Sequence, residues 1–177
     1  MSRIGKEPVK IAEGITVTVN GQNVTVKGQL GELSYTMQDG ITAKVEDGII
    51  KVERKDDSVS NFHGLARALI NNMVIGVSAG YKKQLSIEGT GFKAALQGKI
   101  LSLTLGFASP KLFEIPEGLT VPVENDGLLV SVTGIDKALV GEAAARIRSY
   151  YPAEPYKGKG IKYVGEHIRR KQGKKVA

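Results

Sequence analysis

The segment Gly40-Ile-Thr-Ala-Lys-Val-Glu-Asp-Gly-Ile-Ile50 recurs, with one insertion, as Gly118-Leu-Thr-Val-Pro-Val-Glu-Asn-Asp-Gly-Leu-Leu129. The similarity continues along the chain, so that Ala66-Arg67 corresponds to Ala145-Arg146. Internal similarity of this kind indicates one structural unit that occurs twice. Two copies favour a duplicated pair of domains over an open solenoid, which needs more repeats to bury its core.

The first copy begins with alternating apolar and polar residues. Ile15-Thr-Val-Thr-Val19 and Val24-Thr-Val26 lie on either side of Asn20-Gly21, a pair that tolerates positive φ in a tight turn. We therefore expect a β-hairpin here. The alternation continues through residues 33–52, which extends the hairpin to a small antiparallel sheet with one buried face.

A helical period follows these strands. Apolar residues recur four apart at Leu65, Leu69, Met73 and Val77, after a candidate N-cap at Asp57-Ser58. The pattern predicts an amphipathic helix that packs this stripe against the sheet.

The second copy follows Gly80 with the same order of elements. Alternating segments lie around residues 85–87, 92–96 and 101–105, and a helix with Leu139, Ala143 and Ile147 is expected after Asp136. We predict an α+β fold of two duplicated domains, each a small, mostly antiparallel sheet packed on one helix. The N-terminal domain spans 1–81 and the C-terminal domain spans 82–177, with a basic extension over 154–177.

The net charge of +7 is confined to the end of the chain. Residues 1–155 contain 17 Lys/Arg and 17 Asp/Glu, whereas residues 156–177 contain eight Lys/Arg and one acid, Glu166. Such a block favours a dense polyanion as partner, either nucleic acid or an anionic membrane surface. Charge alone does not distinguish a binding surface from a solvated tail. Within this block a short basic helix is expected over Gly165–Lys171.

The composition excludes several kinds of chemistry. The chain has no cysteine, and its two histidines, His63 and His167, lie far apart in the sequence. A thiolate or zinc site is therefore excluded, and we expect neither a metal nor a cofactor. The sequence contains no long apolar run and no signal-like start, so we expect a soluble, cytosolic protein without a membrane partner.

One short segment resembles a catalytic motif. Gly76-Val-Ser-Ala-Gly80 fits the G-x-S-x-G nucleophile elbow, with Ser78 as nucleophile and His167 as a conceivable base. That elbow needs a strand before the serine and a helix after it, and the order expected here is the reverse. The pattern favours a loop that ends a helix, and we expect no catalytic residue.

The segment Glu154-Pro-Tyr-Lys-Gly-Lys-Gly-Ile-Lys-Tyr163 combines residue types that suit phosphate binding. Lys157 and Lys159 would point to one side of an extended backbone, and Gly158 and Gly160 would let the backbone approach a phosphate. Tyr156 and Tyr163 could stack on bases or could anchor the tail to the domain. A membrane-binding tail would need more bulky apolar residues between its lysines. The combination favours RNA.

Three separated motifs resemble one known family, that of the sixth protein of the large ribosomal subunit in its bacterial form. They are Ser2-Arg-Ile-Gly-Lys6, the helix segments His63–Arg67 and Asn72–Val77, and Glu154–Ile161. The resemblance covers essentially the whole chain. It implies a structural role without catalysis, binding to large-subunit ribosomal RNA, contacts with neighbouring ribosomal proteins, and a C-terminal domain near the docking region of translational GTPases.

The sequence departs from the family pattern at two places. Ala153 stands where the family usually has proline, and Gln29-Leu30 replaces the usual Pro-Lys. The first departure affects how the chain leads into the family signature, which is the motif Glu154–Ile161. The second removes one expected cation from the N-terminal domain.

The resemblance and the charge together select the expected RNA contacts. The signature contributes five of them, the rest of the tail six, and the amino terminus and the domain junction four weaker ones. These residues are Tyr156, Lys157, Gly158, Lys159 and Gly160; Lys162, Arg169, Arg170, Lys171, Lys174 and Lys175; and Arg3, Lys6, Lys82 and Lys83. The alternative interpretation is a nonspecific binder of nucleic acid or other polyanions that uses the tail as an adhesive.

Overall fold

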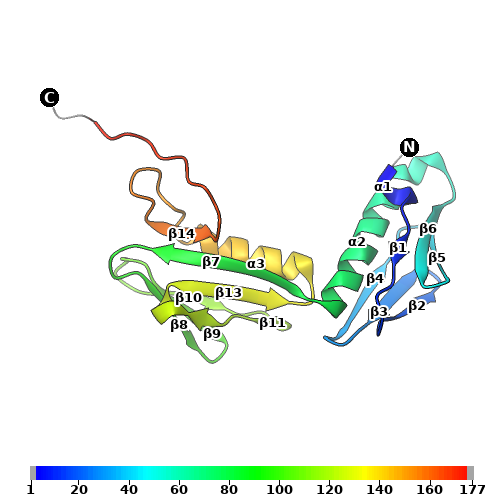
Figure 1. Ribbon diagram of the computed structural model, residues 1–177, viewed down its shortest axis with the longest axis horizontal. Coiled ribbons are helices and arrows are strands. Elements are labelled where there is room, and N and C mark those ends of the chain that lie inside the picture. The colour runs from blue at the N-terminus through cyan, green and yellow to red at the C-terminus, as the bar shows by residue number, and fades with distance from the viewer. Residues whose placement is uncertain (1–2, 175–177) are drawn as a thin grey trace. The chain divides into compact units, whose positions relative to one another are not determined.

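The structure, a computed structural model, describes residues 3–174, and for Arg3 and Ile4 it describes the backbone alone. The chain divides into two compact units (Figure 1). The first contains the residues up to Tyr81 together with Ile135–Lys137, and the second contains Lys82–Gly134 and the residues from Ala138 on. Strands and helices occur in both units, so the predicted α+β class is confirmed.

The first unit contains two three-stranded antiparallel sheets and one long helix. The sheets have the strand orders β2-β3-β4 and β1-β6-β5. The elements are α1 (Arg3–Lys6), β1 (Val9–Lys10), β2 (Thr16–Asn20), β3 (Asn23–Lys27), β4 (Glu32–Thr36), β5 (Ile41–Glu46), β6 (Ile49–Arg54), the 3-10 turn η1 (Asp57–Val59) and α2 (Ser60–Ser78).

The expected hairpin is present. Val19 pairs with Val24 and Asn20 pairs with Asn23, so the connecting residues are Gly21 and Gln22. Gly21 has a φ of +60°, the conformation that a tight turn between twisted strands requires and that glycine adopts without steric cost. The sequence pattern thus located the strands correctly, and the turn residues are shifted by one position.

The buried face of α2 differs from the predicted stripe. Ala66, Ile70, Met73 and Val77 are buried in the core, whereas Leu65 is 48% exposed. A helix has 3.6 residues per turn, so residues spaced four apart shift steadily around its axis. A stripe chosen by that spacing alone therefore includes residues outside the buried face. The prediction for Leu65 was wrong.

The predicted cap at Asp57-Ser58 is also wrong. The N-cap residues are Asp56 for η1 and Val59 for α2, and neither makes a side-chain capping hydrogen bond. The carboxylate of Asp57 instead pairs with the guanidinium of Arg54 at the end of β6. An ion pair to the preceding strand therefore replaces the cap.

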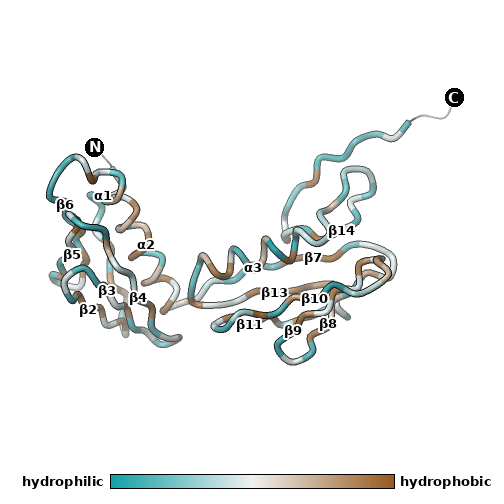
Figure 2. Tube along the Cα trace, turned by 180° about the vertical axis from the view of Figure 1, so that it is seen from behind, coloured by the Kyte–Doolittle hydropathy of each residue, from teal (hydrophilic) through white to brown (hydrophobic). Residues whose placement is uncertain are grey.

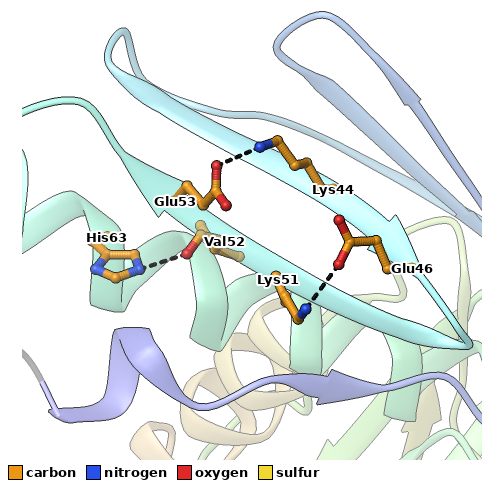
Figure 3. Close-up of polar contacts among 6 residues, drawn as sticks. All are labelled: Lys44, Glu46, Lys51, Val52, Glu53 and His63. Carbon is orange, nitrogen blue, oxygen red and sulfur yellow. Dashed lines mark hydrogen bonds and ion pairs between the residues drawn. The ribbon is translucent and has the colours of Figure 1, made fainter.

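His63 joins α2 to the sheet (Figure 3). Its buried ring donates a hydrogen bond from Nε2 to the carbonyl of Val52, at 2.8 Å. On the solvent-facing side of strands β5 and β6, Lys44 pairs with Glu53 and Lys51 pairs with Glu46. Such exposed pairs stabilise little, so the buried contacts hold the unit together.

The second unit repeats this arrangement. Its sheets have the orders β10-β9-β8 and β11-β13-β7-β14, and β12 also pairs with β13. The elements are β7 (Tyr81–Glu88), β8 (Lys93–Gln97), β9 (Ile100–Thr104), β10 (Lys111–Glu114), β11 (Leu119–Thr120), β12 (Val123–Glu124), the 3-10 turn η2 (Asn125–Gly127), β13 (Leu129–Gly134), α3 (Lys137–Ser149) and β14 (Gly160–Tyr163).

The strand orders of the two units correspond. The order β2-β3-β4 has its counterpart in β8-β9-β10, and β5-β6-β1 has its counterpart in β11-β13-β7. The second unit adds β14 as a further strand on the outer edge of β7. The helix α3 runs along this larger sheet and buries Val140, Ala143, Ala144 and Ile147 (Figure 1). The basic extension is therefore attached to the unit through a strand of its main sheet.

Candidate nucleic-acid interface

A closed loop precedes β14. The Glu154 N–H donates to the Lys159 carbonyl at 2.9 Å, and the Gly158 N–H donates to the Glu154 carbonyl at 3.1 Å. Residues 155–157 form a turn between them. The extended backbone expected for Lys157 to Lys159 is therefore wrong, because local hydrogen bonds fold this stretch back on itself. The two lysines lie on a loop and not on a strand.

The glycines of this loop serve its geometry. Gly158 is buried with a φ of +77°, and its N–H is already bonded to Glu154. Gly160 has a φ of +135°, and a Cβ there would lie 2.7 Å from both Ala153 Cα and the Pro152 carbonyl oxygen. Glycine at position 160 is required because the chain passes this close to the segment before the loop. Contact of either glycine with a phosphate stays a prediction.

The two tyrosines of the segment lie in different surroundings. Tyr156 is at the turn of the loop and is 55% exposed. Tyr163, in β14, is half-buried, and its ring centre lies 5.7 Å from both Lys83 Nζ and Arg148 Cζ. Tyr163 thus anchors β14 within the unit through cation–π contacts, whereas Tyr156 is available for stacking.

The tail after β14 runs back beside the loop. The chain turns at Val164-Gly165, and the Lys171 N–H donates to the Pro155 carbonyl at 2.8 Å. No helix forms over Gly165–Lys171, so that prediction was wrong. The amide of Lys171 bonds across to the loop and not to a carbonyl four residues earlier, which a helix would require. Figure 2 shows this segment as mostly hydrophilic.

The tail and the loop enclose a shallow hollow of about 530 Å³. It is lined by Gly158, Lys162, Glu166, His167, Ile168, Arg169 and Arg170. Arg169 and Arg170 of this lining are exposed, and so are Lys157 in the loop and Lys171 and Lys174 in the tail. The hollow is open and predominantly basic, which suits the phosphates of a polyanion better than an apolar ligand.

One acidic residue holds the tail in this position. The Glu166 carboxylate accepts hydrogen bonds from Arg148 Nε at 3.1 Å and from the Tyr163 N–H at 2.9 Å, and it also pairs with Arg148 Nη2. The Arg148 hydrogen bond and then the Tyr163 N–H lower the pKa of Glu166 below its ordinary value. The same carboxylate raises the pKa of Arg148. Both side chains are therefore charged at neutral pH.

The remaining predicted contacts are distributed over both units. Lys162 is half-buried and pairs with Glu88 of β7, so its charge is partly neutralised. Lys82 and Lys83 are exposed on β7, and the Lys83 ammonium group lies over the ring of Tyr163 in β14. Lys6 is exposed in α1 of the first unit, where the backbone of Arg3 also lies. Lys175 lies outside the described residues.

The sequence reasoning missed Arg148, Glu166 and Glu88. Arg148 sits in the last turn of α3, where a cation is usually explained by the helix dipole. Glu166 could have been noticed as the single acid among eight cations, because an acid that persists in a basic segment often has a specific partner.

Ser78 lies in the last turn of α2 and not at a nucleophile elbow. Ser78 donates its hydroxyl to the Ile75 carbonyl within α2, and a strand follows it, so the order of elements at a nucleophile elbow is reversed. Within residues 3–174, no three His, Cys, Asp or Glu side chains cluster as metal ligands would. No helix of that region is long and apolar enough to cross a membrane.

Comparison with known proteins gives consistent results over nearly the full length. The family model described as ribosomal protein L6 matches two segments, residues 11–80 and 88–164. The chain is 49% identical over 177 residues to the large ribosomal subunit protein uL6 of Brucella canis, with 99% of each chain covered. It is 48% identical, at the same coverage, to the uL6 protein of Hydrogenovibrio crunogenus. With two tandem matches and near-complete relatives at this identity, the chain belongs to the ribosomal protein L6 family.

Proposed function

We propose that this chain, as a constituent of the large ribosomal subunit, binds large-subunit ribosomal RNA with the loop and tail of its second unit. The observation that carries the proposal is the open basic hollow between the loop and the tail. Arg169 and Arg170 line it and are exposed, Lys157 and Lys171 are exposed in the same loop and tail, and Tyr156 is exposed at the turn of the loop. The function is placement and scaffolding, in a protein family that is structural and not enzymatic.

The chemistry of these side chains matches folded RNA. Lysine and arginine neutralise phosphates and release condensed counterions, and arginine can contact a phosphate through two parallel hydrogen bonds. An exposed tyrosine among such cations can stack on an unpaired base or a sugar. Tyr156 lies at the turn of a loop that two backbone hydrogen bonds close, so its backbone would lose little conformational freedom on meeting RNA.

The family resemblance supports two further parts of the proposal. The second unit would lie near the region where translational GTPases dock, and neighbouring ribosomal proteins would contact the chain. Both are partners by position within the subunit. Crosslinking of assembled subunits that carry a photoreactive residue at Lys174 would test the first, because a bound translational GTPase should then be labelled.

The test of RNA binding needs a change that spares the fold. Removing residues 156–177 would take away β14, whose Ile161 is fully buried, and would uncover the edge of β7. The triple variant Arg169→Gln, Arg170→Gln, Lys171→Gln removes only exposed charges and keeps the backbone bond of Lys171 to Pro155. We expect it to bind ribosomal RNA fragments roughly a hundredfold more weakly at moderate salt.

A matched control separates position from net charge. Lys10→Gln, Lys44→Gln, Lys51→Gln also removes three positive charges, here from exposed positions on β1, β5 and β6 of the first unit, two of them in surface ion pairs. It should bind nearly as the unaltered chain does. Equal loss in both variants would contradict a site in the second unit and would favour the nonspecific binder.

Competition distinguishes the specific interpretation from the adhesive one. A constituent of the large subunit should remain bound through a high-salt sucrose gradient at one copy per subunit. It should also prefer ribosomal RNA over duplex DNA of equal length. Removal by salt, together with equal affinity for DNA, would show an adhesive tail instead.

A further inference from the structure

Glu166 is the only acidic residue in the basic segment 156–177. On charge grounds it weakens any affinity for a polyanion, because like charges repel. Its contacts nevertheless place it at the point where the tail leaves β14. There it receives two hydrogen bonds from Arg148 and one from the Tyr163 N–H.

The geometry of this contact restricts the path of the tail. A carboxylate that accepts hydrogen bonds from two nitrogens of one guanidinium has a fixed orientation, unlike a carboxylate beside a lysine. The Arg148 guanidinium also lies over the ring of Tyr163, and the Glu166 N–H donates to the Tyr163 carbonyl at 3.0 Å. The side chains of Arg148 and Glu166 keep only 34% and 23% of their exposure, so solvent screens this pair less than a surface pair.

A second contact that holds the tail lies five residues further along the chain, at Lys171. The Lys171 N–H bonds to the Pro155 carbonyl of the loop. Residues 167–170, between the two contacts, line the basic hollow together with Lys162 and Gly158. The four residues between Glu166 and Lys171 are thus held against the loop at both ends.

We propose that Glu166 is a positioning residue, which through Arg148 holds the basic tail in the conformation that contacts RNA. The inference rests on the proposed function, since it concerns how the same site reaches its affinity. A tail ordered before binding loses less conformational entropy when it meets RNA, and this gain exceeds the repulsion from one carboxylate that is already paired.

The substitution Glu166→Gln separates this idea from plain electrostatics, because the two predict opposite signs. The variant removes the only negative charge of the segment, so electrostatic attraction alone would tighten RNA binding. Loss of the positioning contact would weaken binding instead. We expect the dissociation constant for a ribosomal RNA fragment to rise roughly tenfold.

Two companion variants control the result. Glu142→Gln removes an exposed carboxylate of α3 and changes the net charge equally, so it should bind RNA as tightly as the unaltered chain or slightly more tightly. Exchange of the two partners, Arg148→Glu with Glu166→Arg, keeps the net charge and permits an ion pair between the two positions, but an arginine at position 166 cannot accept the hydrogen bond of the Tyr163 N–H. It should therefore restore only part of the affinity that Arg148→Glu alone loses.

A measurement without RNA tests the positioning directly. In the full chain, the Lys171 amide should be protected from hydrogen exchange, because it donates to Pro155. Glu166→Gln should lower that protection about tenfold while the Ile161 amide, which bonds to the Tyr151 carbonyl, stays protected. The retained protection at Ile161 shows that the unit is still folded.

Each result of these measurements either supports or contradicts the positioning role of Glu166. Weaker RNA binding together with lost protection at Lys171 supports the inference. Unchanged or tighter binding by Glu166→Gln overturns it, as does unchanged protection at Lys171. If the unaltered chain has no affinity for ribosomal RNA, the proposed function fails and the inference fails with it, whereas the hydrogen-exchange result still reports whether the tail is held.

Discussion

At the scale of single residues, Gly160 shows how a position can look functional for a structural reason. A Cβ at this residue would meet Ala153 and Pro152 at 2.7 Å, and the φ of +135° is nearly exclusive to glycine. We predict that Gly160→Ala lowers the free energy of unfolding by roughly 3 kcal/mol.

The matched control is Gly98→Ala in the turn between β8 and β9. Gly98 also has a positive φ, +61°, but a Cβ added there would meet no atom of the described residues within 4 Å. That substitution should cost about 1 kcal/mol through the backbone alone. Urea unfolding of both variants measures the difference, and equal losses would mean that the close approach to Ala153 is not tight.

Glu166 makes stability depend on pH in a defined direction. Hydrogen bonds from Arg148 and Tyr163 lower the pKa of its carboxyl in the folded state below the ordinary value of 4.5. Its contribution to stability is therefore complete above pH 4.5 and is lost as the pH falls through the folded-state pKa. The difference in unfolding free energy between the unaltered chain and Glu166→Gln should shrink on acidification. A constant difference from about pH 7 to about pH 3 would contradict this.

Residue patterns predicted the backbone of the fold but not the site's internal contacts. Alternation located the hairpin of Val19 and Val24 because cross-strand pairing follows a strict period of two. The loop at Gly158 and the pairing of Arg148 with Glu166 join residues that no local period relates. Charge counting identified where the cations are, and only tertiary contacts show which of them, such as Lys162, are already paired.

At the scale of elements, α1 packs against α2 where Gly5 lies next to the ring of His63. A Cβ on Gly5 would lie 2.6 Å from Nδ1 of His63, whose ring is buried and bonded to Val52. We predict that Gly5→Ala costs about 2 kcal/mol of stability in the unaltered chain, because the ring cannot move without leaving its hydrogen bond.

A double-mutant cycle tests this explanation. In a His63→Ala background the space beside Gly5 is free, so Gly5→Ala should be neutral or slightly stabilising. The coupling energy should therefore be about 2 kcal/mol, measured by urea unfolding of the four proteins. Additive effects would mean that the two residues do not compete for this space.

At the scale of the whole molecule, the structure changes the expected number of phosphate contacts. Eight Lys/Arg lie in residues 156–177, but Lys162 is paired with Glu88. With about 0.9 counterions released per phosphate contact, seven cations give a limiting salt slope near 6, and partial engagement on folded RNA reduces it to roughly 3. The slope is read from a plot of log affinity against log salt concentration.

The same arithmetic predicts the effect of Glu88→Gln, which frees Lys162 without altering the tail. If Lys162 then contacts a phosphate, the salt slope should steepen by up to about 0.9 and affinity at low salt should rise. If Lys162 serves only to hold β14 on β7, the slope should stay unchanged and the free energy of unfolding should fall by at most about 1 kcal/mol. We expect the first result, because Lys162 lies in β14 and lines the same basic hollow as Arg170, which is the proposed RNA surface. A flatter slope would contradict the proposed interface.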